Sequence, residues 1–92
     1  MEPIQQAMPG ALVELLRGAP VSPGKVGFAW RAAVGPAVGK MTSVRLEGRQ
    51  LLVDAASSAW AREIERSTPV ILRRLRTLLA DDAPTSLTVR EP

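Results

Sequence analysis

Apolar residues in the first part of the chain recur at the spacing of an amphipathic helix. In residues 11–18, Leu12, Leu15 and Leu16 fall on one helical face, and the final glycine is typical of a helix end. Residues 19–24 contain two prolines and read as a turn. The pattern therefore predicts a short first helix followed by a break.

A second helix is predicted for residues 23–34. Ser22 followed by a proline is typical of an N-cap and a first helical position, and the Gly35-Pro36 pair is typical of a helix end. Apolar residues repeat at intervals of three and four, which indicates one buried face. They are Val26, Ala29, Trp30, Ala33 and Val34.

Residues 43–56 carry the clearest hairpin signal. In the first half, apolar and charged residues alternate, and Gly48 supplies the turn. The second strand is apolar on both faces in its first half, which favours a central strand. Residues 86–90 alternate in the same way and predict a third strand that could pair with the hairpin.

The longest helical pattern covers residues 58–79, after Ser57 or Ser58 as the N-cap. Pro69 interrupts it, so the region is either one kinked helix or two helices, the second capped by Thr68. Its apolar stripe contains Trp60, Ile64, Ile71, Leu75 and Leu78.

The predicted order is helix, helix, strand, strand, helix, strand. This order is typical of a small α+β domain with its helices on one face of a three-stranded sheet. The chain has 92 residues, of which 46% are hydrophobic, enough for one small core. We expect a flexible N-terminus over residues 1–10 and a single domain over residues 11–92.

The composition argues against several kinds of chemistry. The chain has no Cys and no His, which removes disulfides, cysteine–metal sites and the commonest general base. Glu63 and Glu65 are adjacent to Arg62 and Arg66, as on a solvated helix face. We therefore expect no enzyme activity, no catalytic residue, no metal and no cofactor. With no apolar run of about 20 residues and no visible signal peptide, we expect a cytoplasmic protein without a membrane partner.

The segment "GPAVGKMT" (35–42) is partly similar to a phosphate-binding loop. Such a loop follows a strand, and its second glycine is followed by Lys and then by Ser or Thr. Here the two glycines are one residue too close, and Lys40 is followed by Met41. We interpret the segment as a turn after the helix rather than as a nucleotide site.

The arginines form the most informative polar pattern. The net charge is +3, and all twelve basic residues except Lys25 and Lys40 are Arg. On one continuous helix, most arginines of residues 62–76 fall opposite the apolar stripe, and such a basic stripe is typical of nucleic-acid binding. An ordinary solvated face is the alternative. The residues expected to contact DNA are Lys40, Arg45, Arg49, Arg62, Arg66, Arg73, Arg74 and Arg76.

Trp30 and Trp60 share the apolar stripes rather than the basic one. We therefore interpret both as core residues and not as platforms on which bases stack. Contact with DNA would then be mostly to phosphates and only weakly sequence-specific.

Several short motifs follow one another along the chain. Trp30 precedes a Val-Gly pair (34–35), Thr42 follows, and then come Gly-x-x-Leu-x-Val (48–53) and Ser-Ser-x-Trp-Ala-x-Glu (57–63). This combination resembles the bacterial DciA family, and no single motif carries the resemblance alone.

The resemblance covers roughly residues 26–90 and implies a fold like the KH domain. It also implies a non-catalytic protein that contacts DNA and the hexameric replicative helicase, DnaB, and helps this helicase to load on DNA. Met41 stands where the family usually has a His near Thr42. The Gly35–Gly39 spacing has one residue too many for the G-x-x-G clamp of nucleic-acid-binding KH domains.

Two hypotheses follow. The first is a DciA-type adaptor that binds DNA and presents a surface to the replicative helicase. The second is a protein-interaction module of the same fold without DNA binding, whose partner would dock on the third strand or the first helix. Many family members carry a long disordered tail, whereas this sequence ends at Pro92, which favours the second hypothesis.

Overall fold

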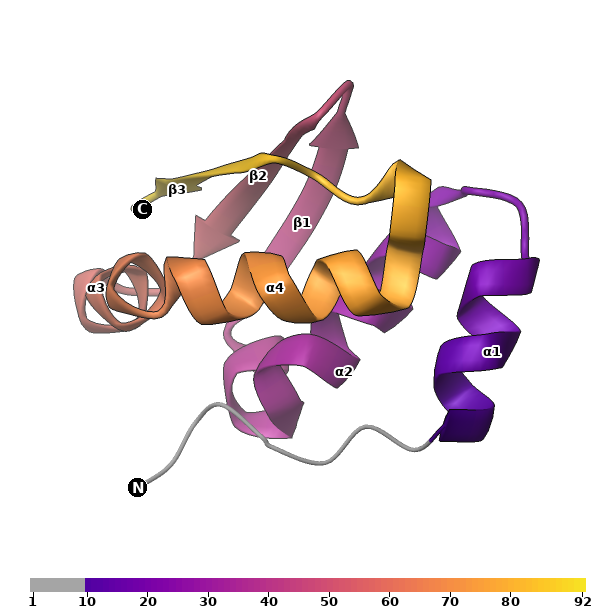
Figure 1. Ribbon diagram of the computed structural model, residues 1–92. Coiled ribbons are helices and arrows are strands. Elements are labelled where there is room, and N and C mark those ends of the chain that lie inside the picture. The colour runs from indigo at the N-terminus through magenta and orange to yellow at the C-terminus, as the bar shows by residue number, and fades with distance from the viewer. Residues whose placement is uncertain (1–9) are drawn as a thin grey trace.

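The computed structural model describes residues 10–92 as helices packed on a three-stranded sheet (Figure 1). The elements are α1 (Gly10–Gly18), α2 (Pro23–Lys40), β1 (Thr42–Glu47), β2 (Gln50–Ala55), α3 (Ser58–Arg66), α4 (Thr68–Leu79), the 3₁₀ turn η1 (Ala80–Asp82) and β3 (Ser86–Arg90). The predicted α+β class and element order are confirmed, with the third predicted helix divided in two. The segment predicted to be flexible lies, apart from Gly10, outside the described residues.

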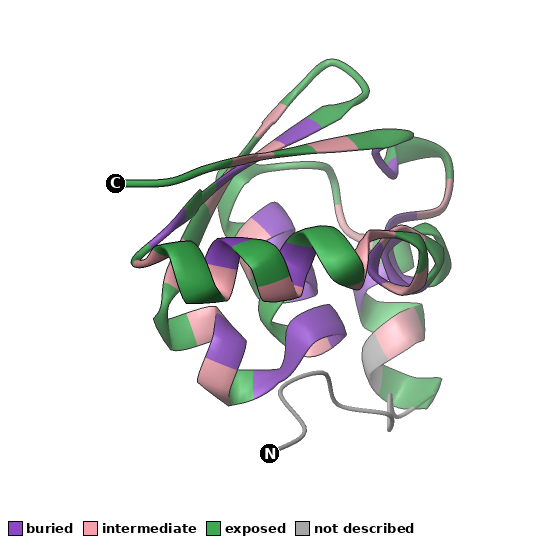
Figure 2. Ribbon diagram, turned by 90° about the vertical axis from the view of Figure 1, so that its left-hand side faces the viewer, coloured by how far each residue is buried: buried purple, intermediate pink, exposed green. Residues whose placement is uncertain are grey.

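The sheet has β2 at its centre, as its apolar run predicted. β1 pairs with β2 in the antiparallel direction, and β3 pairs with β2 in the parallel direction. The hairpin turns at Gly48, whose φ of 60° lies in the left-handed region that favours glycine. In β1 and β3, exposed residues alternate with half-buried ones, and in β2 three buried residues alternate with the exposed Gln50, the half-buried Leu52 and the exposed Asp54. One face of the sheet therefore packs against the helices, and the other, which we call the outer sheet face, meets solvent (Figure 2).

Helix α2 is broken at Gly35, which has a φ of 88° and a ψ of 167°. The predicted helix end at this position is confirmed, but the chain resumes helical geometry at Pro36 and continues to Lys40. A proline suits the first position of a helix because that position needs no N–H donor. Residues 36–40, which belong to the segment that is partly similar to a phosphate-binding loop, therefore form a short helix that leads into β1.

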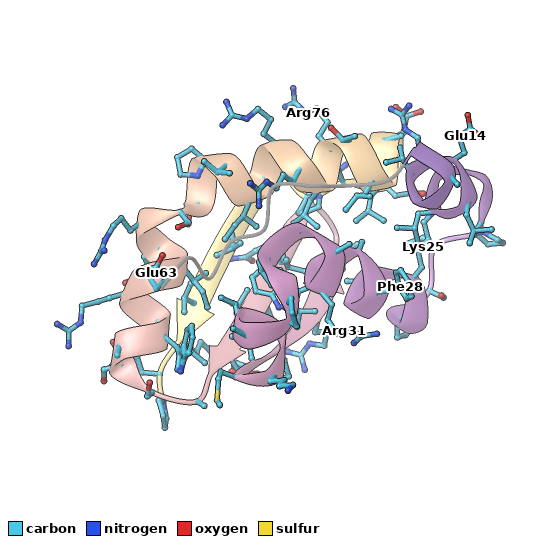
Figure 3. The ribbon with its side chains drawn as sticks, turned by 90° about the horizontal axis from the view of Figure 1, so that it is seen from below. Glu14, Lys25, Phe28, Arg31, Glu63 and Arg76 are labelled. Atoms are coloured by element: carbon cyan, nitrogen blue, oxygen red, sulfur yellow. The ribbon has the colours of Figure 1, made fainter. Side chains whose placement is uncertain are left out.

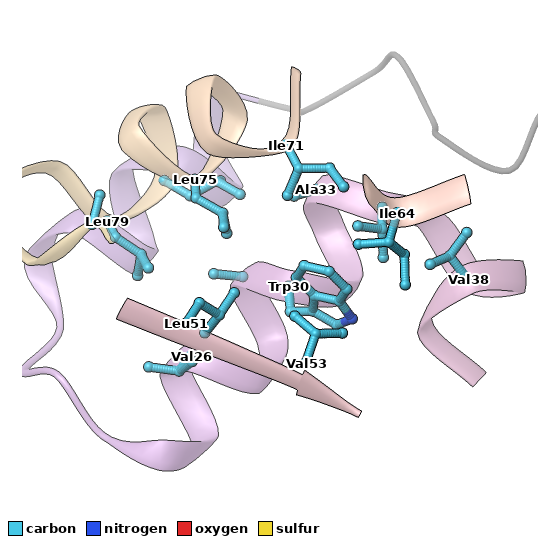
Figure 4. Close-up of a cluster of buried hydrophobic side chains, with 14 of the residues drawn as sticks. Val26, Trp30, Ala33, Val38, Leu51, Val53, Ile64, Ile71, Leu75 and Leu79 are labelled. Atoms are coloured by element: carbon cyan, nitrogen blue, oxygen red, sulfur yellow. The ribbon is translucent and has the colours of Figure 1, made fainter. Parts of the chain in front are cut away.

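The core lies between the sheet and the helices, with Trp30 at its centre (Figure 4). Trp30 is 2% exposed and lies near Val53 of β2. Trp60 is half-buried and packs against the edge of this core, so its interpretation as a core residue holds only in part. In α1, Leu16 is buried, but Leu15 is 70% exposed, which corrects the predicted apolar face. The prediction for Leu12 falls outside what the structure describes.

The chain changes direction at Ser67, between α3 and α4. Ser57 caps α3 by accepting a hydrogen bond from the N–H of Trp60. Ser67 ends α3 and begins α4, with a proline at the start of α4, so two helices form rather than one kinked helix. The N-cap of α4 is Ser67 and not Thr68, whose hydroxyl donates to the carbonyl of Ile64 at 3.0 Å. Figure 1 shows α3 nearly end-on while α4 runs across the view.

Candidate nucleic-acid interface

The turn at Ser67 divides the predicted basic stripe. Because α3 and α4 run in different directions, their arginines face solvent from two helices and do not form one continuous line (Figure 3). The exposed residues of the predicted set are Arg62 and Arg66 on α3, Arg73 and Arg76 on α4, Arg45 on the outer sheet face, Arg49 at the hairpin turn and Lys40 at the end of α2. The fold thus spreads the predicted contact residues over several surfaces.

Arg74 is not part of any of these surfaces. Its side chain is buried and its Nη1 donates a 2.8 Å hydrogen bond to the carbonyl oxygen of Ala33. A helical segment that ends at Val34 leaves its last carbonyls without partners in the helix, and Arg74 satisfies one of them. The expectation that Arg74 contacts DNA is corrected: it joins α4 to the break in α2.

Several exposed cations are paired with nearby carboxylates. Arg66 lies 3.6 Å from Glu63 on the same helix, and Arg45 lies 2.9 Å from Glu47 on the same strand. Exposed pairs of this kind contribute only about 0–1 kcal/mol, and such weak pairs can exchange their carboxylate for a phosphate. They nevertheless reduce the positive potential of the surface around them.

Arg90 has the most complete pairing on the outer sheet face. Its Nε and Nη2 donate to the two carboxylate oxygens of Asp54 at 2.9 and 3.1 Å. This bidentate hydrogen bond, together with the charge of Asp54, raises the pKa of Arg90 above its ordinary value. The outer sheet face is therefore largely neutralised, because Arg45 is paired there as well.

Three arginines on α3 and α4 remain without an ionic partner among residues 10–92. They are Arg62, Arg73 and Arg76, and all three are exposed. Figure 3 shows Arg76 pointing away from the body of the domain on the outer side of α4. We call Arg62, Arg66, Arg73 and Arg76 the helical basic surface. Its positive charge is only partly offset, by Glu63 and the exposed Glu65.

The structure also brings together arginines that the sequence analysis did not connect. A groove of about 330 Å³ lies where α1, α4 and the hairpin turn meet. We call it the corner groove; its lining residues are Arg17, Arg49, Arg76, Ala80, Asp81, Ala83, Pro84 and Thr85. Arg17 was missed because no periodicity relates α1 to the hairpin; only the packing of α1 beside α4 places it there.

Apolar side chains are exposed where α1 ends and α2 begins. Leu15 and Phe28 line a groove between these helices, and Phe28 is 45% exposed. The guanidinium of Arg31 lies 5.9 Å from the centre of the Phe28 ring. Figure 3 shows both side chains on α2, on the underside of the domain. No helix within residues 10–92 is both long and apolar enough to cross a membrane.

The described residues define a small α+β domain with arginines exposed on α1, α2, α3 and α4. The family model described as "Dna[CI] antecedent, DciA" matches residues 3–89 of the sequence. The chain therefore belongs to the DciA family, a family related to the loading of the replicative helicase. A search of curated proteins finds no match.

Proposed function

We propose that this protein is a non-catalytic, cytoplasmic adaptor that binds DNA through phosphates and assists the replicative helicase, of the DnaB type. Membership of the DciA family supports the helicase as partner. The observation that carries the DNA-binding part is the helical basic surface, where Arg62, Arg73 and Arg76 have no ionic partner among residues 10–92. Arg49 and Lys40 add positive charge on other parts of the domain. Arg45 adds less to the positive potential because it is paired with Glu47.

The mechanism that fits this surface is scaffolding. Arginines on a rigid helix hold phosphates in place without reading base edges, so binding is weakly sequence-specific. A domain that holds a DNA strand beside the helicase ring would raise the local concentration of DNA at the ring. No covalent chemistry is required of the side chains for this role.

Two double variants test the DNA-binding part. Arg62→Ala with Arg73→Ala removes two unpaired arginines of the helical basic surface. Arg31→Ala with Arg90→Ala removes the same charge elsewhere. For single-stranded DNA, the first variant is expected to lower the slope of log affinity against log salt by about 0.7 for each lost phosphate contact. The control is expected to keep the wild-type slope. Equal slopes for wild type and the first variant would refute the assignment, provided that circular dichroism shows both folded.

The helicase part is tested by co-elution of the chain with the replicative helicase of the same organism. The experiment is run with and without a single-stranded oligonucleotide. Formation of a complex supports the adaptor function, and a complex strengthened by the oligonucleotide supports joint binding. No complex in either condition would count against the helicase as partner.

A second candidate function is a protein-interaction module without DNA binding. The exposed Leu15 and Phe28 favour it, because apolar side chains gathered at a groove are typical of protein contacts. This candidate predicts no DNA affinity near physiological salt. The adaptor function, in contrast, requires that the wild type binds DNA. The second candidate also predicts that Leu15→Ser with Phe28→Ser abolishes co-elution with the helicase.

A further inference from the structure

Arg49 in the corner groove is held in place by the fold. Its Nη1 donates hydrogen bonds to the carbonyl oxygens of Asp81 and Ala83, the latter at 3.3 Å. Its own carbonyl accepts the N–H of Thr85 at 2.8 Å and that of Ser86 at 3.3 Å. Since the backbone and the side chain are both tied to the segment before β3, Arg49 loses little conformational freedom when it binds a ligand.

The bonds made by Arg49 leave one edge of its guanidinium available. Both side-chain bonds use Nη1, and no hydrogen bond within residues 10–92 uses Nε or Nη2. That edge carries two parallel N–H groups, which match two oxygens of a phosphate or a carboxylate. Arg90 uses the same edge to hold Asp54. Arg49 therefore provides an oriented bidentate donor for an acidic group.

Arg17 and Arg76 bring two more positive charges to the same groove. They stand in the last turns of α1 and α4, where cations also offset the helix dipoles. Neither forms an ion pair within residues 10–92. Three arginines against the single carboxylate of Asp81 leave an excess of two positive charges among the lining residues. Like charges gathered at one groove repel, and an anion relieves this repulsion.

We propose that the corner groove is a binding site for a phosphate group, held by Arg49 through its free edge and by Arg17 and Arg76 through charge. The phosphate belongs to the backbone of DNA, and this part of the inference rests on the proposed function. Arg73 and Arg76 are three residues apart on α4 and so lie on one side of that helix. A strand that follows the helical basic surface along α4 therefore reaches the corner groove at the end of the helix.

Arg17→Ala tests this inference, because Arg17 belongs to the corner groove and not to the helical basic surface. The affinity of the full chain for a single-stranded oligonucleotide is measured at several salt concentrations. The variant is expected to weaken binding equally for different sequences and to lower the salt slope by about 0.7, the change expected for one lost phosphate contact on a single strand. Arg31→Ala, which removes the same charge from α2, is expected to leave the slope unchanged. Arg17→Lys is expected to retain most of the affinity and the wild-type salt slope, because it keeps the positive charge through which Arg17 acts.

A variant that is expected to strengthen binding distinguishes a specific loss of DNA affinity from one caused by misfolding. Asp81 contributes its carbonyl to Arg49, and its carboxylate adds the only negative charge among the lining residues. Asp81→Asn keeps the main chain and removes that charge. It is expected to increase DNA affinity and the response to inorganic phosphate, an increase that an unfolded variant could not produce.

Inorganic phosphate supplies a probe that does not depend on DNA binding. Titration of the ¹⁵N-labelled protein is expected to shift the Nε–H signals of Arg49, Arg17 and Arg76 more than that of Arg31. If the wild type binds DNA but Arg17→Ala changes neither affinity nor slope, the inference fails and the proposed function stands. If phosphate shifts these signals but the wild type has no DNA affinity, the site stands and DNA binding fails. If phosphate shifts no groove signal, the site is refuted.

Discussion

The indole Nε1 of Trp30 donates a 2.8 Å hydrogen bond to the hydroxyl oxygen of Thr42, which donates in turn to the carbonyl of Val38 at 2.8 Å. This chain of two bonds ties α2 to the first residue of β1. It lets the largest side chain of the core be almost fully buried without leaving its polar atom unpaired.

Thr42→Val tests the importance of this bond. The substitution keeps the shape of the side chain but removes the acceptor for the buried N–H of Trp30. The free energy of unfolding is expected to fall by about 1–3 kcal/mol, as measured by urea denaturation. Thr88→Val, on the exposed outer sheet face, serves as the control and is expected to change stability by less than about 0.5 kcal/mol. Equal effects of the two substitutions would contradict the role given to Thr42.

Adjacent arginines on α4 are expected to have opposite roles. Arg74→Met leaves the carbonyl of Ala33 without its donor and should lower the free energy of unfolding by about 1–3 kcal/mol. Arg73→Met changes an exposed side chain and should alter stability by less than about 0.5 kcal/mol. For DNA affinity the expectation is the reverse. Measured at a temperature at which both variants are folded, only Arg73→Met should weaken DNA binding. Urea denaturation and anisotropy titration together check this; a loss of DNA affinity confined to Arg74→Met would be the contrary result.

Ala80 is a non-glycine residue with a φ of 52° and a ψ of −120°. Strained backbone of this kind costs about 1–3 kcal/mol. We expect Ala80→Gly to raise the free energy of unfolding by about 1 kcal/mol, because relief of strain exceeds the extra chain entropy that glycine brings to the unfolded state. Ala32→Gly, in the middle of α2, should instead lower it by about 1 kcal/mol. Thermal denaturation of both variants shows whether each substitution raises or lowers the stability. A destabilised Ala80→Gly variant would show that the backbone at this position is not strained.

Neighbouring leucines of α1 are expected to differ in their effect on stability. Leu16 is 6% exposed and belongs to the core, whereas Leu15 is 70% exposed. Leu16→Ala should cost about 2–4 kcal/mol through lost burial and the remaining cavity. Leu15→Ala should change stability by less than about 0.5 kcal/mol. Denaturation curves that rank the two in the other order would place Leu15, not Leu16, in the core.

Much of the architecture was predictable from the sequence because it depends on local periodicity and local turn chemistry. The alternation of residues 43–56 located the hairpin, and Gly48 marked its turn because few other residues adopt a positive φ without strain. The spacing of Trp30 with its apolar neighbours identified the buried face of α2. The apolar start of β2 identified the central strand.

The sequence interpretation was less accurate for the surroundings of individual side chains. One continuous helix was assumed for the basic stripe, although a new helix begins at Ser67. Arg74 was grouped with the other arginines by its charge, although its spacing from Ile71 and Leu78 puts it on the apolar side of a helix, and its side chain turns toward Ala33. The same limit applied to Leu15, since three leucines in a short helix do not show how many of them the neighbouring helix covers. A wheel gives relative angles within one element but not its rotation against the rest of the domain.

The sequence by itself determined the α+β class, the order of the elements, the central strand, the burial of Trp30 and the resemblance to the DciA family, because each depends on residues close together in the chain. Only the tertiary structure decided which arginines are free, which are paired and which one is buried. It also decided that Arg17, Arg49 and Arg76, from three separate elements, line one groove. Contacts between distant segments depend on how the helices pack around the core, and no local spacing in the chain encodes that packing.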